Sequence, residues 1–194
     1  MRGMFGQLSE GQEPHALMIA CSDSRVVPNL ITDTRPGELF VERNPGNIAP
    51  VFSTKLMGAA SASIEYAVGV LQVPNIIVCG HSDCGVMKGI LSPKTVKKLP
   101  AVRHWLEFGP SPEEVAEIED PVERLEMLTE LNVLMQVENL KTHPSVAAKW
   151  KKGRIGLFGW VFDIETGAVR AWDEKKGKFL PWPPEPGEKR TKGK

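Results

Sequence analysis

The chain has 194 residues, which is enough for one compact domain that buries a sizeable apolar core. Its 24 Lys and Arg residues balance its 24 Asp and Glu residues, so the formal net charge is zero. Because nucleic acids and anionic membranes attract proteins through excess positive charge, the sequence predicts neither partner and favours a small-molecule ligand.

Membrane insertion and secretion are also disfavoured. The apolar runs, such as residues 16–21 and 76–79, are far shorter than the ~20 residues of a membrane-spanning helix, and the first residues lack an apolar signal core. The cysteines, Cys21, Cys79 and Cys84, have no disulfide-framework spacing, which favours reduced thiols. We therefore expect a cytoplasmic protein whose thiolates are free to bind a metal.

Three short apolar runs, in residues 16–21, 38–42 and 75–79, are typical of strands buried on both faces of a parallel sheet. Between the second and third runs, residues 53–71 carry apolar side chains at helical spacing behind a potential N-cap, Ser53. The sequence therefore predicts two parallel strands joined by a crossover helix, and such crossovers are strongly biased to be right-handed. Ligands bind such sheets beyond the carboxyl ends of the strands.

The middle of the chain is predicted to be helical. Residues 85–91 indicate a short helix, and residues 111–114 carry the serine, proline and glutamate of a capped helix start. Residues 121–140 carry an apolar stripe of helical period and predict a long helix.

The end of the chain is predicted to form an antiparallel hairpin, with strands in residues 154–163 and 169–172 around a glycine turn. The fold class is therefore α/β, with a central, mainly parallel sheet flanked by helices and a C-terminal antiparallel hairpin. We expect a single catalytic domain over residues 1–180. A Pro-rich, basic tail, residues 181–194, is expected to be mostly disordered.

Two short segments carry the residues of a metal site. Cys21 ends the first predicted strand, and His81 and Cys84 follow the third, so all three lie at one rim of the sheet. Zinc prefers thiolate and imidazole ligands in a tetrahedral set, and catalytic zinc sites leave one position for water or substrate. Three candidate ligands therefore indicate a catalytic site with one Zn²⁺ per chain.

A closed structural zinc site is the alternative, because Cys79 would supply a fourth thiolate two residues before His81. Cys79 ends an apolar run, however, where a free cysteine commonly behaves as a small buried hydrophobe. We favour the buried role for Cys79 and an open fourth position on the metal.

Asp23 lies two residues after Cys21 and would either coordinate the metal or accept a hydrogen bond from metal-bound water. Arg25 can hold this carboxylate bidentately, keep it ionised and draw it away from zinc. Two thiolates neutralise the metal charge, so the bound water is acidified less and activity is expected to favour alkaline pH. Coordination of zinc by Asp23, in a closed form at low pH, would sharpen this trend.

Together these motifs, Cys21-x-Asp23-x-Arg25 and a His81-x-x-Cys84 that begins 60 positions after Cys21, resemble those of the β-class carbonic anhydrases. The resemblance extends to residues 36–40, 43–44, 63–67, 79–85 and 159–167. It implies reversible hydration of carbon dioxide to bicarbonate and a proton, through attack by zinc-bound hydroxide. It also implies that Cys21, His81 and Cys84 hold zinc, while Asp23 and Arg25 orient the nucleophile.

The resemblance further implies a substrate pocket formed by Gln12, Phe40, Tyr66 and Gly85, of which the first three come from the adjoining subunit. We therefore expect a homodimer or a dimer of dimers with active sites at the subunit interface. Met18 stands where regulated members carry a tryptophan, which favours the plant-like type, as in a bacterial or cyanobacterial member. The N-terminal arm that wraps the partner subunit in relatives is expected to be short or trimmed here.

Two other functions are compatible with the same ligands. One is hydrolysis of a carbon dioxide analogue, carbonyl sulfide or carbon disulfide, which differs in the walls of the pocket and its access. The other is a non-catalytic zinc scaffold in a carboxysome-like assembly, which would add carboxysome association to the cytoplasmic location. Asp23 beside Arg25 argues against a scaffold, because a purely structural zinc requires no such pair.

Overall fold

A computed structural model describes residues 5–6, 8–55 and 58–184 of the chain. Its centre is a six-stranded sheet in the order β2-β1-β3-β4-β5-β6. The strands are β1 (Ala16–Cys21), β2 (Leu39–Asn44), β3 (Asn75–His81), β4 (Gly156–Phe162), β5 (Val169–Asp173) and β6 (Lys178–Trp182). The first four are parallel, and β5 and β6 join antiparallel at one edge. The predicted α/β class with a mainly parallel sheet is thus confirmed.

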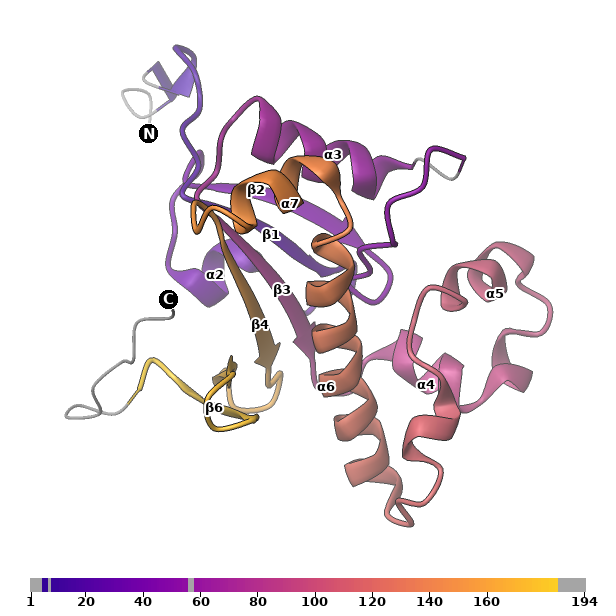
Figure 1. The fold of residues 1–194 in the computed structure, drawn as a ribbon. Coiled ribbons are helices and arrows are strands. Elements are labelled where there is room, and N and C mark those ends of the chain that lie inside the picture. The colour runs from indigo at the N-terminus through magenta and orange to yellow at the C-terminus, as the bar shows by residue number, and fades with distance from the viewer. Residues whose placement is uncertain (1–4, 7, 56–57, 185–194) are drawn as a thin grey trace.

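Helices cover both faces of the sheet. They are α2 (Pro28–Thr32), α3 (Ala59–Gly69), α4 (Gly85–Leu91), α5 (Pro100–Leu106), α6 (Pro121–Leu140) and α7 (Pro144–Trp150), with 3-10 turns η1 (Pro93–Val96) and η2 (Pro112–Val115). Figure 1 shows α3, α6 and α7 on one face, α2 on the other, and α4 and α5 beyond the carboxyl end of β3. Within the described residues, no helix combines the length and apolarity that crossing a bilayer requires.

Strands β1 and β3 are buried on both faces, which explains their continuous apolar sequences. Leu17 and Val78 face the core formed with α3, α6 and α7. Met18 and Ile77 face the opposite core, which includes Val26 at the start of the α2 segment. Burying both faces fixes the ends of β1 and β3 side by side, and the predicted site lies at these ends.

Two glycines leave room for α6 to pack against the sheet. A Cβ on Gly80 of β3 would stand 2.7 Å from Cγ2 of Val133, and one on Gly159 of β4 would stand 2.8 Å from Cγ1 of the same valine. Val133 is fully buried between these strands and α6. The absence of both side chains therefore sets the distance between α6 and the sheet near the end of β3.

The crossover helix begins later than the sequence predicts. Its first residue is Ala59 and its N-cap is Gly58, whereas Ser53 lies in the preceding loop. The Ser53 hydroxyl accepts a hydrogen bond from the Lys55 amide at 3.3 Å, so it stabilises a local turn and does not cap a helix. Residues 56–57 lie outside the described residues.

The predicted helix start at residues 111–114 is only a 3-10 turn, η2. Its capping box is present, with the Ser111 amide donating to Glu114 at 3.1 Å. The long helix begins afresh at Pro121, because the Asp120 carboxylate accepts hydrogen bonds from the amides of Val122 and Glu123 at 2.9 and 2.8 Å. Two cap sequences thus produce two separate elements.

A sixth strand was not predicted, and it includes Pro181 and Trp182 from the segment assigned to the tail. The β5–β6 connection is closed by Asp173, whose carboxylate accepts from the amides of Lys175 and Lys176, each at 3.0 Å. Because β6 is the edge strand, a proline in it leaves no ladder partner unsatisfied. Residues 185–194 lie outside the described residues, so their predicted disorder stays a prediction.

Candidate metal centre

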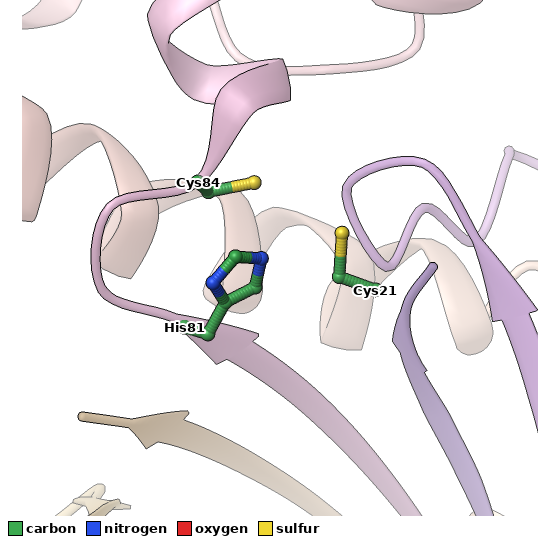
Figure 2. A group of neighbouring side chains, drawn as sticks. All are labelled: Cys21, His81 and Cys84. Carbon is green, nitrogen blue, oxygen red and sulfur yellow. The ribbon is translucent and has the colours of Figure 1, made fainter. Parts of the chain in front are cut away.

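Three side chains from two strand ends and one helix start converge on one point. Cys21 is the last residue of β1, His81 is the last residue of β3, and Cys84 is the N-cap of α4. Their ligand atoms all lie within 4.8 Å of one another, and all three residues are buried. Figure 2 shows both sulfur atoms and the imidazole facing the space between β1, β3 and the start of α4.

The two nitrogens of His81 have different surroundings. Nδ1 lies 2.8 Å from the carbonyl oxygen of Ser82, to which it can donate a hydrogen bond. Nε2 is buried and has no hydrogen-bond partner within the described residues. A ring that donates through one nitrogen and leaves the other with a free lone pair is the arrangement found in metal-binding histidines. The site therefore fits a metal ion next to Nε2.

The sulfur of Cys21 is stabilised as a thiolate. The pKa of Cys21 is lowered to about 4, chiefly because the Cys84 thiol donates a hydrogen bond to its sulfur. His81 and the backbone amides of Gly46 and Asp23, at 3.3 and 3.4 Å from the sulfur, add to this effect against the opposing cost of burial. The pKa of Cys84 is raised, because it gives that hydrogen bond and is buried. A thiolate, a thiol and an imidazole suit zinc, whose binding would release the remaining thiol proton.

Asp23 is held in place by Arg25. Nε of Arg25 donates to Oδ1 at 3.0 Å and Nη2 donates to Oδ2 at 2.8 Å, while the Arg25 amide also donates to Oδ1 at 3.0 Å. These bonds hold the pKa of the Asp23 carboxyl well below its usual range. Among the described residues, the group able to hold a metal comprises Cys21, His81 and Cys84 without Asp23. Coordination by Asp23 in a closed, low-pH form therefore stays a prediction.

Asp83 is a further part of this arrangement that the sequence analysis missed. It has a left-handed backbone, with φ of 60°, and its carboxylate accepts hydrogen bonds from Nη1 of Arg25 at 3.1 Å and from Lys88. Arg25 thus joins the loop after β1 to the loop after β3. The signal was the position of Asp83 between His81 and Cys84, but only the folded loop shows which cation it meets.

A pocket of about 330 Å³ opens beside the cluster, with largely apolar walls. Its lining residues are Cys21, Ser22, Asp23, Pro45, Gly85, Val86, Gly89, Val96, Val102 and Leu106. Asp23 is thus placed in a concave, mostly apolar environment of the kind that small-molecule sites use.

The other predicted pocket residues are not brought to this cavity by one chain. Phe40 on β2 stacks on Tyr66 of α3 with ring centroids 5.9 Å apart, and Tyr66 is 46% exposed. Gln12 is exposed in the segment that precedes β1. Only Gly85 of the four predicted substrate-binding residues lines the pocket. The roles of Gln12, Phe40 and Tyr66 in a partner's site stay predictions.

Cys79 is separate from the metal group. Its side chain is fully buried in the core that includes Met18 and Ile77, and burial raises the pKa of its thiol to about 12. Cys79 thus behaves as the buried apolar residue that the sequence favoured.

The chain is similar to known proteins over most of its length, both in sequence and in fold. The sequence matches the Carbonic anhydrase family over residues 16–169. A carbonic anhydrase of Pseudomonas aeruginosa is 48% identical over 180 residues, which are 91% of this chain and 81% of the relative. The solved structure of the β-carbonic anhydrase CcaA is 40% identical with a TM-score of 0.85, covering 93% of this chain and 82% of CcaA.

A second solved structure is one of two tetrameric β-carbonic anhydrases from Sordaria macrospora. It is 32% identical with a TM-score of 0.71, over 88% of this chain and 86% of that one. The family match, the sequence identities and the shared fold agree with the geometry of the Cys21, His81 and Cys84 cluster. The chain belongs to the β-class carbonic anhydrases.

Proposed function

We propose that this protein catalyses the reversible hydration of carbon dioxide with one Zn²⁺ held by Cys21, His81 and Cys84. The observation that carries the proposal is the buried, unpartnered Nε2 of His81, which lies with two sulfur atoms in one group within the described residues. When bound there, zinc would act as a Lewis acid and would lower the pKa of a water molecule at the coordination position that the three side chains leave open.

Asp23 would orient the nucleophile. Because Arg25 keeps its carboxyl ionised, Asp23 can only accept hydrogen bonds, and its two oxygens are fixed by the guanidinium and the Arg25 amide. An acceptor fixed in this way would hold the proton of the attacking oxygen and leave a lone pair directed at the carbon of the substrate. Arg25 contributes by keeping the charge and position of that acceptor constant.

The pocket beside Asp23 suits an apolar substrate. Pro45, Val86 and Leu106 present apolar atoms next to the carboxylate, and Gly85 leaves room because it has no side chain. Carbon dioxide carries no charge and loses little on leaving water, whereas bicarbonate is an anion that such walls solvate poorly. The same walls would therefore admit the substrate and favour release of the product.

A second copy of the chain would complete the site. Phe40 is partly buried against the core, whereas Tyr66, which stacks on it, is exposed outside the chain's own pocket, and this is consistent with use of Tyr66 in a partner's site. The Sordaria macrospora relatives are described as tetrameric. We include in the proposal a homodimer or dimer of dimers in the cytoplasm, where the three unbridged, buried cysteines would stay reduced.

The direct test is Asp23→Asn, measured by stopped-flow hydration of carbon dioxide on protein of known zinc content. The substitution removes the negative charge and replaces one acceptor oxygen by an NH2 donor, so it is expected to lower the rate by about 100-fold or more, with zinc still bound at one equivalent. Asp33→Asn is the matched control, because Asp33 lies outside the cluster and has a left-handed backbone that asparagine tolerates. An unchanged rate in the Asp23 variant would overturn the mechanism.

The same zinc-loaded sample can be assayed with carbonyl sulfide. We expect hydration of carbon dioxide to be much the faster reaction. Faster hydrolysis of carbonyl sulfide would instead support the analogue hydrolase that shares these ligands.

A further inference from the structure

One peptide group beside the metal centre is held at both ends. The amide of Gly46 donates to the sulfur of Cys21 at 3.3 Å. The carbonyl of the same peptide unit belongs to Pro45, and it accepts a hydrogen bond from the indole Nε1 of Trp105 on α5 at 2.7 Å. Trp105 is therefore connected to Cys21 through a single planar peptide group.

The loop that carries this peptide has little freedom to move. Asn44 to Asn47 form a turn closed by a 3.2 Å hydrogen bond, with proline and a glycine of positive φ, 80°, at its centre. A Cβ on Gly46 would lie 2.7 Å from Cγ1 of Val86, so the turn packs directly against α4. Rotation of the peptide would have to break this packing or the hydrogen bond between Asn132 and the Gly46 carbonyl.

A buried polar pair on α6 holds the following peptide. Nδ2 of Asn132 donates to the carbonyl of Gly46 at 3.0 Å, and Oδ1 of Asn132 accepts from Gln136 at 3.0 Å. Gln136 in turn accepts from the amide of Ala49 at 3.0 Å. Both side chains are at most 1% exposed. Burying them would be costly without these partners, so the pair favours this one loop position.

We propose that Trp105 is a positioning residue of the metal centre, and that Asn132 is its second anchor. The indole N–H of Trp105 orients the Pro45–Gly46 peptide so that the Gly46 amide points at the Cys21 sulfur. Because the Pro45 carbonyl accepts the indole hydrogen bond, the Gly46 N–H of the same peptide becomes more polarised. A hydrogen-bonded thiolate is preorganised for the metal and gives it less electron density. The inference rests on the proposed zinc site and adds that a helix outside the ligand set tunes it.

A merely structural role for Trp105 is the competing explanation, because its ring also contacts Phe108 edge-on at 5.6 Å. The two roles separate if only the indole N–H is removed. Incorporating 3-benzothienylalanine at position 105 keeps the bicyclic ring and replaces the N–H by sulfur. Trp105→Phe is the simpler second variant. Trp150→Phe, on the partly exposed α7, is the matched control.

The experiment uses Co²⁺ as a spectroscopic probe and Zn²⁺ in competition with a chelator, on the full chain. When the indole N–H is missing, the Gly46 amide should make a weaker hydrogen bond to the Cys21 sulfur. The thiolate should then donate more electron density to Co²⁺, so its charge-transfer band should move to lower energy in both Trp105 variants. Loss of preorganisation should weaken zinc binding by about tenfold or more. The Trp150 variant should match the unmodified protein in both measurements.

The outcomes are distinguishable. Unmodified protein that binds neither metal would overturn the proposed function and this inference with it. Normal metal binding in the unmodified protein, with an unmoved band and unchanged zinc affinity in the benzothienylalanine variant, would overturn only the role of Trp105. A band shift of equal size in the Trp150 control would also overturn it, because the effect would then be unspecific.

Discussion

At the scale of single residues, the candidate metal centre depends on which atoms are held by hydrogen bonds and which face the space shared by the three side chains. The Ser82 carbonyl occupies Nδ1 of His81, and Arg25 occupies both oxygens of Asp23. Nε2 of His81 and the Cys21 sulfur remain directed at the common space in Figure 2. Arg25 thus holds the Asp23 carboxylate, while Nε2 of His81 has no hydrogen-bond partner among the described residues.

Two of the three buried cysteines, Cys79 and Cys84, should respond differently to removal. Cys84→Ala deletes one of three donor atoms, so we expect zinc to be lost on dialysis and hydration activity with it. Cys79→Ala, the matched control, removes a sulfur outside the group and should keep zinc at one equivalent. Zinc is measured by atomic absorption after equal dialysis. Full zinc content in the Cys84 variant would contradict the ligand assignment.

His143, which is 2% exposed, should make stability depend on pH. Burial lowers the pKa of His143, while its hydrogen bond to the Pro50 carbonyl at 3.0 Å and the charge of Glu65 act in the opposite direction. The unfolded chain therefore binds this proton more readily, and folding stability should fall as pH drops below the ordinary histidine value of about 6.5.

His143→Gln keeps a side-chain N–H for the Pro50 carbonyl but cannot titrate. Its free energy of unfolding, measured by urea denaturation, should decline less between about pH 7 and pH 5 than that of the unmodified protein. The comparison of slopes is the test, because the substitution also alters the absolute stability. Equal slopes in both proteins would show that His143 is not responsible.

The candidate ligands were predictable because each depends on local sequence. Cys21 and His81 end apolar strands, and Cys84 follows at a spacing that one loop accommodates. The supporting contacts were not predictable, because they join distant positions. Arg25 and Asp83 are 58 residues apart, and Trp105 and Pro45 are 60 apart. No local pattern marks such pairs before the fold brings them together.

At the scale of elements, α6 determines how the sheet and the loop beside the site are joined. It packs closely on β3 and β4 through Val133, and it fixes the loop after β2 through Asn132. The strands and α6 were predictable from their apolar periods. The start of the crossover helix was not, because the same hydroxyl that caps helices also closes local turns, as Ser53 does. Strand β6 was hidden by its proline, which only an edge strand accepts.

The close approach of α6 gives a prediction about coupled substitutions. Gly80→Ala should destabilise the protein by about 1–3 kcal/mol, because its new Cβ would overlap Val133. Val133→Ala should also destabilise it, through lost apolar burial. The double variant should cost clearly less than the sum of the two, since the shortened valine makes room for the methyl group. Urea denaturation measures all three, and additivity within about 0.5 kcal/mol would refute the proposed contact.

At the scale of the whole molecule, the parallel strands bring the cluster to one end of the sheet, but the chain's own pocket lacks Gln12, Phe40 and Tyr66. We predict that Asp23→Asn and Tyr66→Ala complement each other in mixed dimers. In a two-fold dimer whose partners share each site, a hybrid has one intact site, so a one-to-one mixture should regain about a quarter of normal activity. Activity no greater than the mean of the two pure variants would indicate that Tyr66 serves its own chain or no site.

Zinc titration of the metal-free protein, followed by stopped-flow hydration of carbon dioxide, tests whether this β-class carbonic anhydrase acts through a metal at Cys21, His81 and Cys84. We expect the hydration rate to rise in proportion to added zinc, to level off at one equivalent per chain, and to be lost on chelation. Full activity without metal, or no activity with one zinc bound per chain, would contradict this expectation.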